Sequence, residues 1–441
     1  MSTANKLSYL NDTKSLLRTS LNKFGSSILS TDTFRSYDTK LNDIYNKLPK
    51  VTQSGAGFTL SDVQNGQVDD FKMNGVDLEQ SETPTPENPQ EIKVVEGRQV
   101  ITDKGKNLLK LREISGTNNG ITISYDEATQ VYTFNGTCTQ DNTTFPLSNN
   151  EINFTNGITK SITYWVNGSC SEYCSIRHYD SSYSSSCTYS ILNISSTNNK
   201  IEKTSNASFV CPARMTSIKF NNNSVANNLQ IKIMVTDDEN TDFEPYYEPV
   251  SYNIDLQLAN IYLAKMPDTT YKNRIYKNNG NWYYEENVKK IVLDGSEEWT
   301  YWTNQELTNT ILVGTKIIDN ISNVDYIGMS NYFENSSTSI WTTDEQKMQI
   351  NSTGENKIRF RINKTIANNY NSFKTWLSTH NVIVWYPLAT SVTTQITNTT
   401  LINQLEAISV HTGTNIITLS SNNNMTPQIE ITRLKELERL T

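Results

Sequence analysis

Apolar side chains recur at alternating steps of three and four residues in the first 48 positions of the chain. This spacing places them on one face of an α-helix over residues 6–24 and again over residues 34–48, with Lys14 interrupting the first seam. Pro49 stops the second helix, because the residue before a proline is pushed out of the α region. The pattern predicts a helical hairpin. Since each helix is too short to be stable alone, the seams must pack against each other, against another copy or against a docking partner. The seam residues, which we expect to serve anchoring or oligomerisation, are Leu7, Leu10, Leu17, Leu21, Phe24, Phe34, Tyr37, Leu41 and Ile44.

Beyond residue 95 the pattern changes to short runs of β-favouring residues separated by turn formers. Asn118-Asn119-Gly120 and Asn198-Asn199 are typical of these turns. Such regular alternation between residues 105 and 250 predicts a jelly-roll-like β-sandwich. The expected strands are Ile121–Tyr125, Val131–Asn135, Ile162–Val166, Ser175–Tyr179, Cys187–Ile194, Phe209–Cys211, Thr216–Phe220 and Leu229–Val235.

The remaining segments contain fewer such runs. Residues 50–104 include the proline-dense stretch Thr83–Pro89, which predicts a stiff connector with short strands. Residues 251–289 predict a second connector with a hairpin that turns at Asn278–Asn281. Residues 290–400 predict a second, smaller β-sandwich with a helix at Asn371–Leu377, and residues 401–441 a C-terminal segment. The predicted fold is therefore mainly β, an N-terminal α-helical hairpin followed by two jelly-roll-like β-sandwich modules.

Composition narrows the class of protein. Aromatic residues make up 10% of the chain. Charged residues make up 19%, which is below the roughly 25% of charged residues usual for soluble domains. This composition favours extracellular binding modules over metabolic enzymes. The formal net charge of −8, without a run of Lys or Arg, argues against a nucleic-acid partner. We expect no membrane insertion, because no stretch approaches the length of an apolar span, and no secretory signal, because Met1–Leu10 is polar.

Catalytic chemistry has little support in the sequence. The three histidines, His178, His380 and His411, lie in no nucleophile, zinc or acid–base motif. Adjacent carboxylates such as Glu285-Glu286 and Glu297-Glu298 would point to opposite faces of one strand, so we expect solvated loop charges and no glycosidase pair. The five cysteines cannot all pair within one chain, and we expect free or buried thiols. The sequence predicts no enzyme, no catalytic residue, no cofactor and no metal site.

Several stretches resemble phage virion proteins. Tyr9–Lys14 and Thr31–Tyr37 look like the N-terminal helical segment of phage structural proteins from low-GC Gram-positive and gut bacteria. The region that begins at Gly105–Leu109 and ends at Phe243–Tyr246 resembles the carbohydrate-binding-module-like β-sandwich of phage tail, baseplate and fibre proteins. Stretches similar to the second module of that group are Val292–Trp299, Phe373–Leu377 and Ile396–Ile402. Together these stretches span most of the chain, and their order is that of a phage virion appendage protein.

This resemblance implies a structural protein of a bacteriophage virion, a tail or head fibre or baseplate appendage, which is assembled in the host cytoplasm and functions extracellularly. It implies a homotrimer, or else a dimer, that contacts other virion structural proteins through its N-terminus and a host cell-surface glycan through its sandwiches. One alternative is a purely structural capsid-decoration or baseplate connector protein without receptor binding. A glycan depolymerase is favoured less, since the short runs fit small sandwiches better than a long parallel β-helix.

A glycan site needs exposed aromatic faces for the C–H surfaces of sugars and polar groups for their hydroxyls. The stretch Tyr173–Tyr189 combines both around a Ser-rich loop, with a structural pair of Tyr-rich strands as the alternative. Tyr164-Trp165 and Trp299–Trp302 are more typical of core aromatics. The candidate glycan-binding residues are Tyr173, Arg177, His178, Tyr179, Tyr183 and Tyr189.

Overall fold

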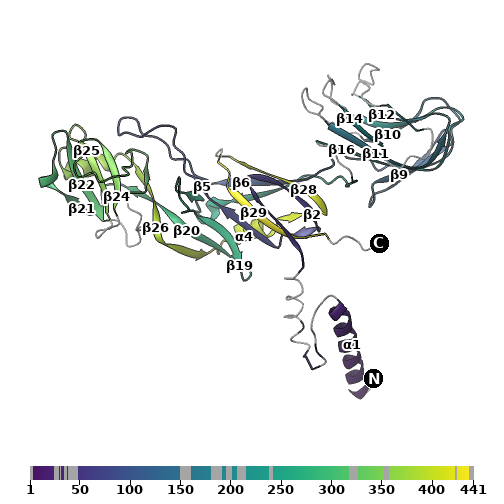
Figure 1. Cartoon of the computed structure of the whole chain (residues 1–441), viewed down its shortest axis with the longest axis horizontal. Coiled ribbons are helices and arrows are strands. Elements are labelled where there is room, and N and C mark those ends of the chain that lie inside the picture. Colours follow the sequence, from purple (N-terminus) through teal and green to yellow (C-terminus); the bar gives the residue numbers. More distant parts are fainter. Residues whose placement is uncertain are drawn as a thin grey trace.

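The structure is a computed structural model of the whole chain. It describes residues 3–23, 29, 31–33, 37, 48–148, 160–179, 191–194, 201–205, 215–237, 242–316, 326–351, 357–422 and 425–436. These residues are mainly β, which confirms that part of the predicted fold, and nearly all their strands pair antiparallel. Figure 1 shows three β lobes in a row. We call them the sandwich lobe (residues 107–237), the central lobe (residues 50–105, 250–287 and 392–436) and the distal lobe (residues 288–391).

The sandwich lobe consists of two antiparallel sheets. Its strands are β7 (Gly116–Asn118), β8 (Ile121–Asp126), β9 (Val131–Thr137), β10 (Thr143–Ser148), β11 (Lys160–Ser171), β12 (Cys174–Tyr179), β13 (Ile191–Ile194), β14 (Ile201–Ser205), β15 (Met215–Phe220) and β16 (Val225–Thr236). One sheet has the order β14-β11-β16-β9-β8-β7 and the other the order β10-β15-β12-β13. Six of the eight strands expected from the sequence are present at their predicted places. Only the end of Cys187–Ile194 is described, and Phe209–Cys211 lies outside the described residues.

The core of the sandwich lobe lies between the two sheets. Because successive strand residues point to opposite faces, every second residue is buried there. Phe134 of β9 lies 5.8 Å from Phe145 of β10 and 5.6 Å from Phe220 of β15, measured between ring centroids. These aromatic contacts join the two sheets.

The central lobe combines segments that are far apart in the sequence. Its elements are β1 (Lys50–Gly55), β2 (Gly57–Val63), β3 (Gly66–Gln67), β4 (Asp70–Asn74), β5 (Val76–Asp77), β6 (Arg98–Gly105), β17 (Val250–Asp255), η3 (Leu256–Ala259), β18 (Ala264–Lys265), β19 (Arg274–Asn278), β20 (Asn281–Leu293), β26 (Val382–Gln395), α4 (Thr399–Glu406), β27 (Ser409–Val410), β28 (Gly413–Ser421) and β29 (Gln428–Leu434). With β23 (Met329–Ser330), seven strands form a sheet of order β1-β29-β4-β19-β20-β26-β23. The sheet β17-β6-β28-β2 shares a core with it.

The segments expected as two connectors and a C-terminal tail thus supply strands to common sheets. Leu60, Ile275 and Ile431, one from each segment, are fully buried in the same core. The stretch Thr83–Pro89 contains none of the named strands. Sequence periodicity identifies strands but not their distant partners, and each segment alone has too few strands to suggest a sandwich.

A long two-stranded ribbon connects the central and distal lobes. Strands β20 and β26 pair from Tyr283 opposite Gln395 to Leu293 opposite Val382. One end of the ribbon packs into the central core through Trp282, and the other packs into the distal core through Leu293. Figure 1 shows the ribbon running between the two lobes.

The distal lobe packs a four-stranded sheet against the end of this ribbon and a helix. Its elements are β21 (Trp299–Tyr301), η4 (Thr303–Gln305), β22 (Thr310–Lys316), β24 (Lys347–Asn351), β25 (Lys357–Asn363) and α3 (Tyr370–Leu377), with the sheet order β21-β22-β25-β24. Helix α3 confirms the predicted helix, and Asn369 and Ser372 form a capping box at its start. Phe333, Phe360 and Phe373 meet in the core behind it.

The first predicted N-terminal helix is present as α1 (Thr3–Lys23). The seam residues Leu10 and Leu17 are 54% and 44% exposed, so no described part of the chain covers them. The second predicted helix falls outside the described residues, apart from Tyr37, which is buried, and Leu48, which is half-buried. The side chains of Leu7, Leu21, Phe24, Phe34, Leu41 and Ile44 also lie outside the described residues.

Candidate functional site

Three neighbouring strands of the sandwich lobe, β11, β16 and β9, line a hollow of about 140 Å³. Along β11, Ile162, Tyr164 and Val166 are buried in the core between the sheets. Trp165 and Asn167 alternate with them and therefore lie on the opposite face, which is partly exposed. The hollow thus lies on the open face of the six-stranded sheet.

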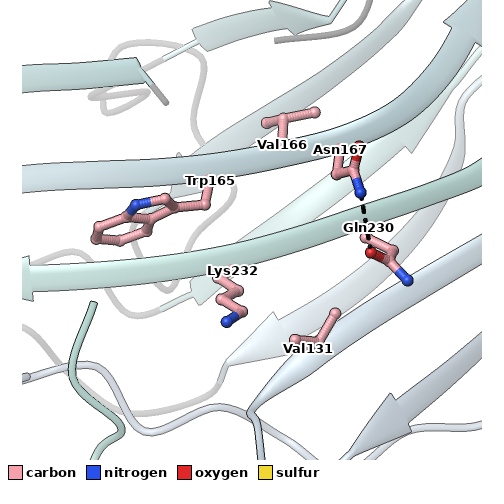
Figure 2. Close-up of a pocket in the computed structure, with 6 residues that line it drawn as sticks. All are labelled: Val131, Trp165, Val166, Asn167, Gln230 and Lys232. Carbon is pink, nitrogen blue, oxygen red and sulfur yellow. Dashed lines mark hydrogen bonds between the residues drawn. The ribbon is translucent and has the colours of Figure 1, made fainter. Parts of the chain in front are cut away.

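The register of the strands brings the functional groups of the hollow together. Trp165 lies directly opposite Lys232, and Asn167 directly opposite Gln230. Val131 at the start of β9 completes this surface (Figure 2). We call Trp165, Asn167, Gln230, Lys232 and Val131 the Trp165 platform.

Phe243 holds the aromatic part of the platform in place. Its ring packs edge-on against the indole of Trp165, with 5.3 Å between centroids and 81° between planes. The ammonium group of Lys232 lies 5.0 Å from the centroid of the same ring, which is a cation–π contact. The indole and the ammonium group are therefore oriented by one shared neighbour.

The amide part of the platform is fixed by the backbone. The Gly168 N–H donates to Oδ1 of Asn167 at 2.9 Å, and Nδ2 of Asn167 donates to Oε1 of Gln230 at 3.4 Å (Figure 2). Gly168 has a φ of +81°, and a Cβ at this position would lie 2.0 Å from the carbonyl oxygen of Asn228. Only glycine fits at this bulge, which sets the position of Asn167.

The charge of the platform comes from Lys232 alone, because all other residues that line the hollow are neutral. An indole face, amide groups and one cation can bind a ligand that has both an apolar ring surface and hydrogen-bonding groups. Among the described residues, no Asp, Glu, His, Cys, Ser or Tyr lines the hollow.

The site predicted at Tyr173–Tyr189 lies on the other sheet and is only partly described. Nη2 of Arg177 donates to the Tyr173 hydroxyl at 2.8 Å, and Nε of Arg177 donates to Ser175 at 3.2 Å. The structure therefore brings Tyr173 and Arg177 together. The side chains of His178 and Tyr179, and the whole of Tyr183 and Tyr189, lie outside the described residues.

The structure corrects the prediction that Tyr164-Trp165 are both core aromatics. Tyr164 is fully buried, but Trp165 points away from the core because it is the next residue along the strand. The alternation of Ile162, Tyr164 and Val166 was the signal that could have identified Trp165. Nothing in the sequence indicated that Gln230 and Lys232 would lie opposite.

Outside the platform, the described cysteines and two of the histidines lie in positions that suggest a structural role. Cys138, Cys170 and Cys174 are buried free thiols, as predicted for the cysteines. His380 stacks on Trp376 and His411 on Tyr247, with centroids 4.1 and 4.0 Å apart. Across the described ranges, no three His, Cys, Asp or Glu side chains are grouped to hold a metal ion. No helix in the same ranges is long and apolar enough to cross a membrane.

Comparison with known proteins identifies no relative: no protein-family model matches the chain, and no curated protein matches it.

Proposed function

We propose that this chain is a structural protein of a bacteriophage virion, a tail or head fibre or baseplate appendage, that binds glycans of the bacterial surface through the Trp165 platform. The main support for a glycan-binding role is that Trp165 is partly exposed on an open sheet face, beside the amide groups of Asn167 and Gln230. Burial of that indole under a sugar ring would supply apolar contact, while Asn167, Gln230 and Lys232 would bind hydroxyl or acidic oxygens. The virion role rests on the sequence resemblance.

The pairing of strands in the sandwich lobe supports a jelly-roll topology. Strand β9 pairs with β16, β10 with β15, β11 with β14 and β12 with β13. This nested pairing is what results when one long antiparallel hairpin is rolled into two sheets. Such a sandwich resembles the carbohydrate-binding modules expected from the sequence.

The anchoring and oligomerisation role is proposed for α1. Leu7, Leu10, Leu17, Leu21 and Phe24 follow the a and d positions of a heptad, with Lys14 at a central a position. The exposure of Leu10 and Leu17 supports a partner for this seam, either other copies in a homotrimer or another virion protein. Deletion of residues 1–49 should leave the three lobes folded but abolish incorporation into particles. Normal incorporation of the truncated chain would rule out the anchoring role.

The experiment for the glycan role is binding of the full chain to an array of bacterial-surface glycans. The full chain is needed, because a shorter fragment such as residues 95–400 would lack β1, β2, β4, β28 and β29 of the central lobe. We expect specific binding that Trp165→Ala removes. A flat response would instead favour a purely structural capsid-decoration or baseplate connector protein. Release of oligosaccharide from capsule or wall would indicate a depolymerase.

A further inference from the structure

Lys232 differs from those lysines of the protein that have an acidic partner. Lys72, Lys265 and Lys277, for example, form ion pairs of 2.5–2.7 Å with Glu430, Asp77 and Glu406. Lys232 has no carboxylate within ion-pair distance among the described residues, and its contact there is the face of Phe243. Its positive charge is therefore not neutralised by the residues that line the hollow.

The hydrogen-bonding groups of the platform are mostly donors. Oδ1 of Asn167 accepts from the Gly168 N–H, and Oε1 of Gln230 accepts from Asn167. These two bonds engage both amide oxygens, and Nε2 of Gln230 points away from Asn167 (Figure 2) and keeps its hydrogens for another acceptor. With the three donors of the Lys232 ammonium group, the platform is suited to a ligand rich in acceptors.

We propose that the Trp165 platform selects a glycan unit that carries an anionic substituent, a carboxylate or a phosphate, which pairs with Lys232 while the sugar ring covers the Trp165 indole. This inference rests on the proposed glycan-binding function and adds the ligand class. A charge-assisted hydrogen bond to the ammonium group is stronger than a neutral one, and the register places that group directly opposite the indole. A neutral sugar would leave the Lys232 charge unpaired beneath it, which disfavours that ligand.

The test compares the full chain with Lys232→Gln on an array of neutral, carboxylated and phosphorylated oligosaccharides, with Lys232→Arg as the matched charge-conserving variant. We expect the array hits to be carboxylated or phosphorylated members. Lys232→Gln should weaken them at least tenfold, whereas Lys232→Arg should retain most of the binding. Raising the salt concentration should weaken binding by the wild type, because the contact is partly exposed, but not the residual binding by Lys232→Gln. The two anionic arms of the array distinguish a carboxylate from a phosphate.

Two results would overturn the inference and leave the proposed function intact: equal binding of neutral and anionic members, or loss of binding in Trp165→Ala without an effect of Lys232→Gln. Failure to bind any glycan would overturn both. Binding of an acidic peptide at the platform with no glycan binding would also overturn both. Unchanged thermal unfolding of the variants checks that the sheet is intact.

Discussion

A buried carboxyl group lies in the central lobe, next to the segment of residues 242–249 that follows the sandwich lobe. Asp103 of β6 is 4% exposed, and its Oδ1 lies 4.0 Å from Nε2 of His411. Tyr247 stacks on the His411 ring, and Glu244 accepts hydrogen bonds from the backbone and hydroxyl of Thr414. Burial raises the pKa of Asp103 from 3.8 to about 7, while burial lowers the pKa of His411.

Asp103→Asn should therefore change how stability depends on pH. The folded state holds the Asp103 proton more tightly than the unfolded state, so this group costs stability as pH rises from about 4 to about 7. A rise in pKa from 3.8 to about 7 corresponds to roughly 4 kcal/mol as an upper limit. His411 acts in the opposite direction, since its lowered pKa costs stability as pH falls below 6.5.

We expect Asp103→Asn to match the wild type near pH 4 and to exceed its free energy of unfolding by about 2 kcal/mol or more at pH 8. Urea unfolding at a series of pH values measures the difference. A constant difference across this pH range would show that Asp103 keeps an ordinary pKa.

The orientation of single side chains was only partly predictable. The strand run Ile162–Val166 was evident in the sequence, and its alternation assigns Tyr164 and Trp165 to opposite faces. Aromatic residues in succession nevertheless suggested a core. The position of Lys232 opposite Trp165 depends on the register between β11 and β16. The paired residues of these strands are about 65 positions apart in the sequence, and a local pattern does not encode such a pairing.

At the scale of elements, the buried residue Asn273 stabilises the ribbon formed by β20 and β26. It contacts the ribbon at the point where the pairing of these two strands shifts register, between Glu286 and Val288. The Asn273 amide donates to the Tyr262 and Val288 carbonyls and to the Tyr284 hydroxyl, at 2.9–3.1 Å. Its Oδ1 accepts from the N–H groups of Asn287 and Val288, both at 2.8 Å. Asn273 is fully buried, so its loss leaves several polar groups without partners.

Asn273→Ala should lower the free energy of unfolding by about 3 kcal/mol. Asn253→Ala, at an exposed position of β17, is the matched control and should change it by less than about 0.5 kcal/mol. Thermal or urea unfolding of both variants measures the contrast. Equal effects would mean that the Asn273 network does not stabilise the ribbon.

The exposed apolar seam of α1 leads to a second prediction at the scale of elements. The double substitution Leu10→Asp and Leu17→Asp should convert the expected trimer to monomer, because it places charges in an apolar interface. Leu16→Asp changes a residue that is 70% exposed and lies off the seam, and it should leave the assembly unchanged. Native mass spectrometry gives the stoichiometry. A monomeric wild type would contradict self-association through α1.

Short-range signals predicted the elements well. The hairpin between β19 and β20 turns at Asn279-Gly280, whose φ values of 47° and 79° match the two left-handed positions expected for an Asn-Gly turn. Helix α3 follows the placement of Phe373 and Leu377 on one face. The hydrophobic and turn patterns of these elements act over a few residues, so the sequence shows them directly.

At the scale of the whole molecule, the main sheet of the central lobe combines strands from early and late parts of the chain. Strand β29 lies between β1 and β4, with Ile429 and Ile431 fully buried. No local signal linked residue 50 to residue 434, which is why the sequence suggested connectors instead of a lobe. This topology brings a segment that follows the N-terminal helix against the last described strand.

Deletion of residues 428–441 should unfold the central lobe, because removal of an interior strand exposes its core and leaves two strand edges unpaired. Deletion of residues 437–441 removes no described strand and should leave the lobe stable. Limited proteolysis with mass identification of the fragments measures this. Resistance of residues 50–105 to protease in the longer deletion would contradict the proposed dependence.

The most direct test of the whole account is the affinity of the full chain for its best array glycan, measured by calorimetry for wild type, Trp165→Ala and Tyr370→Ala. Tyr370 is an aromatic residue of the distal lobe that is 38% exposed, so it controls for loss of a surface ring. We predict that Trp165→Ala weakens binding at least about tenfold while Tyr370→Ala has no effect. Equal affinity of all three proteins would contradict glycan binding at the open face of the sandwich lobe.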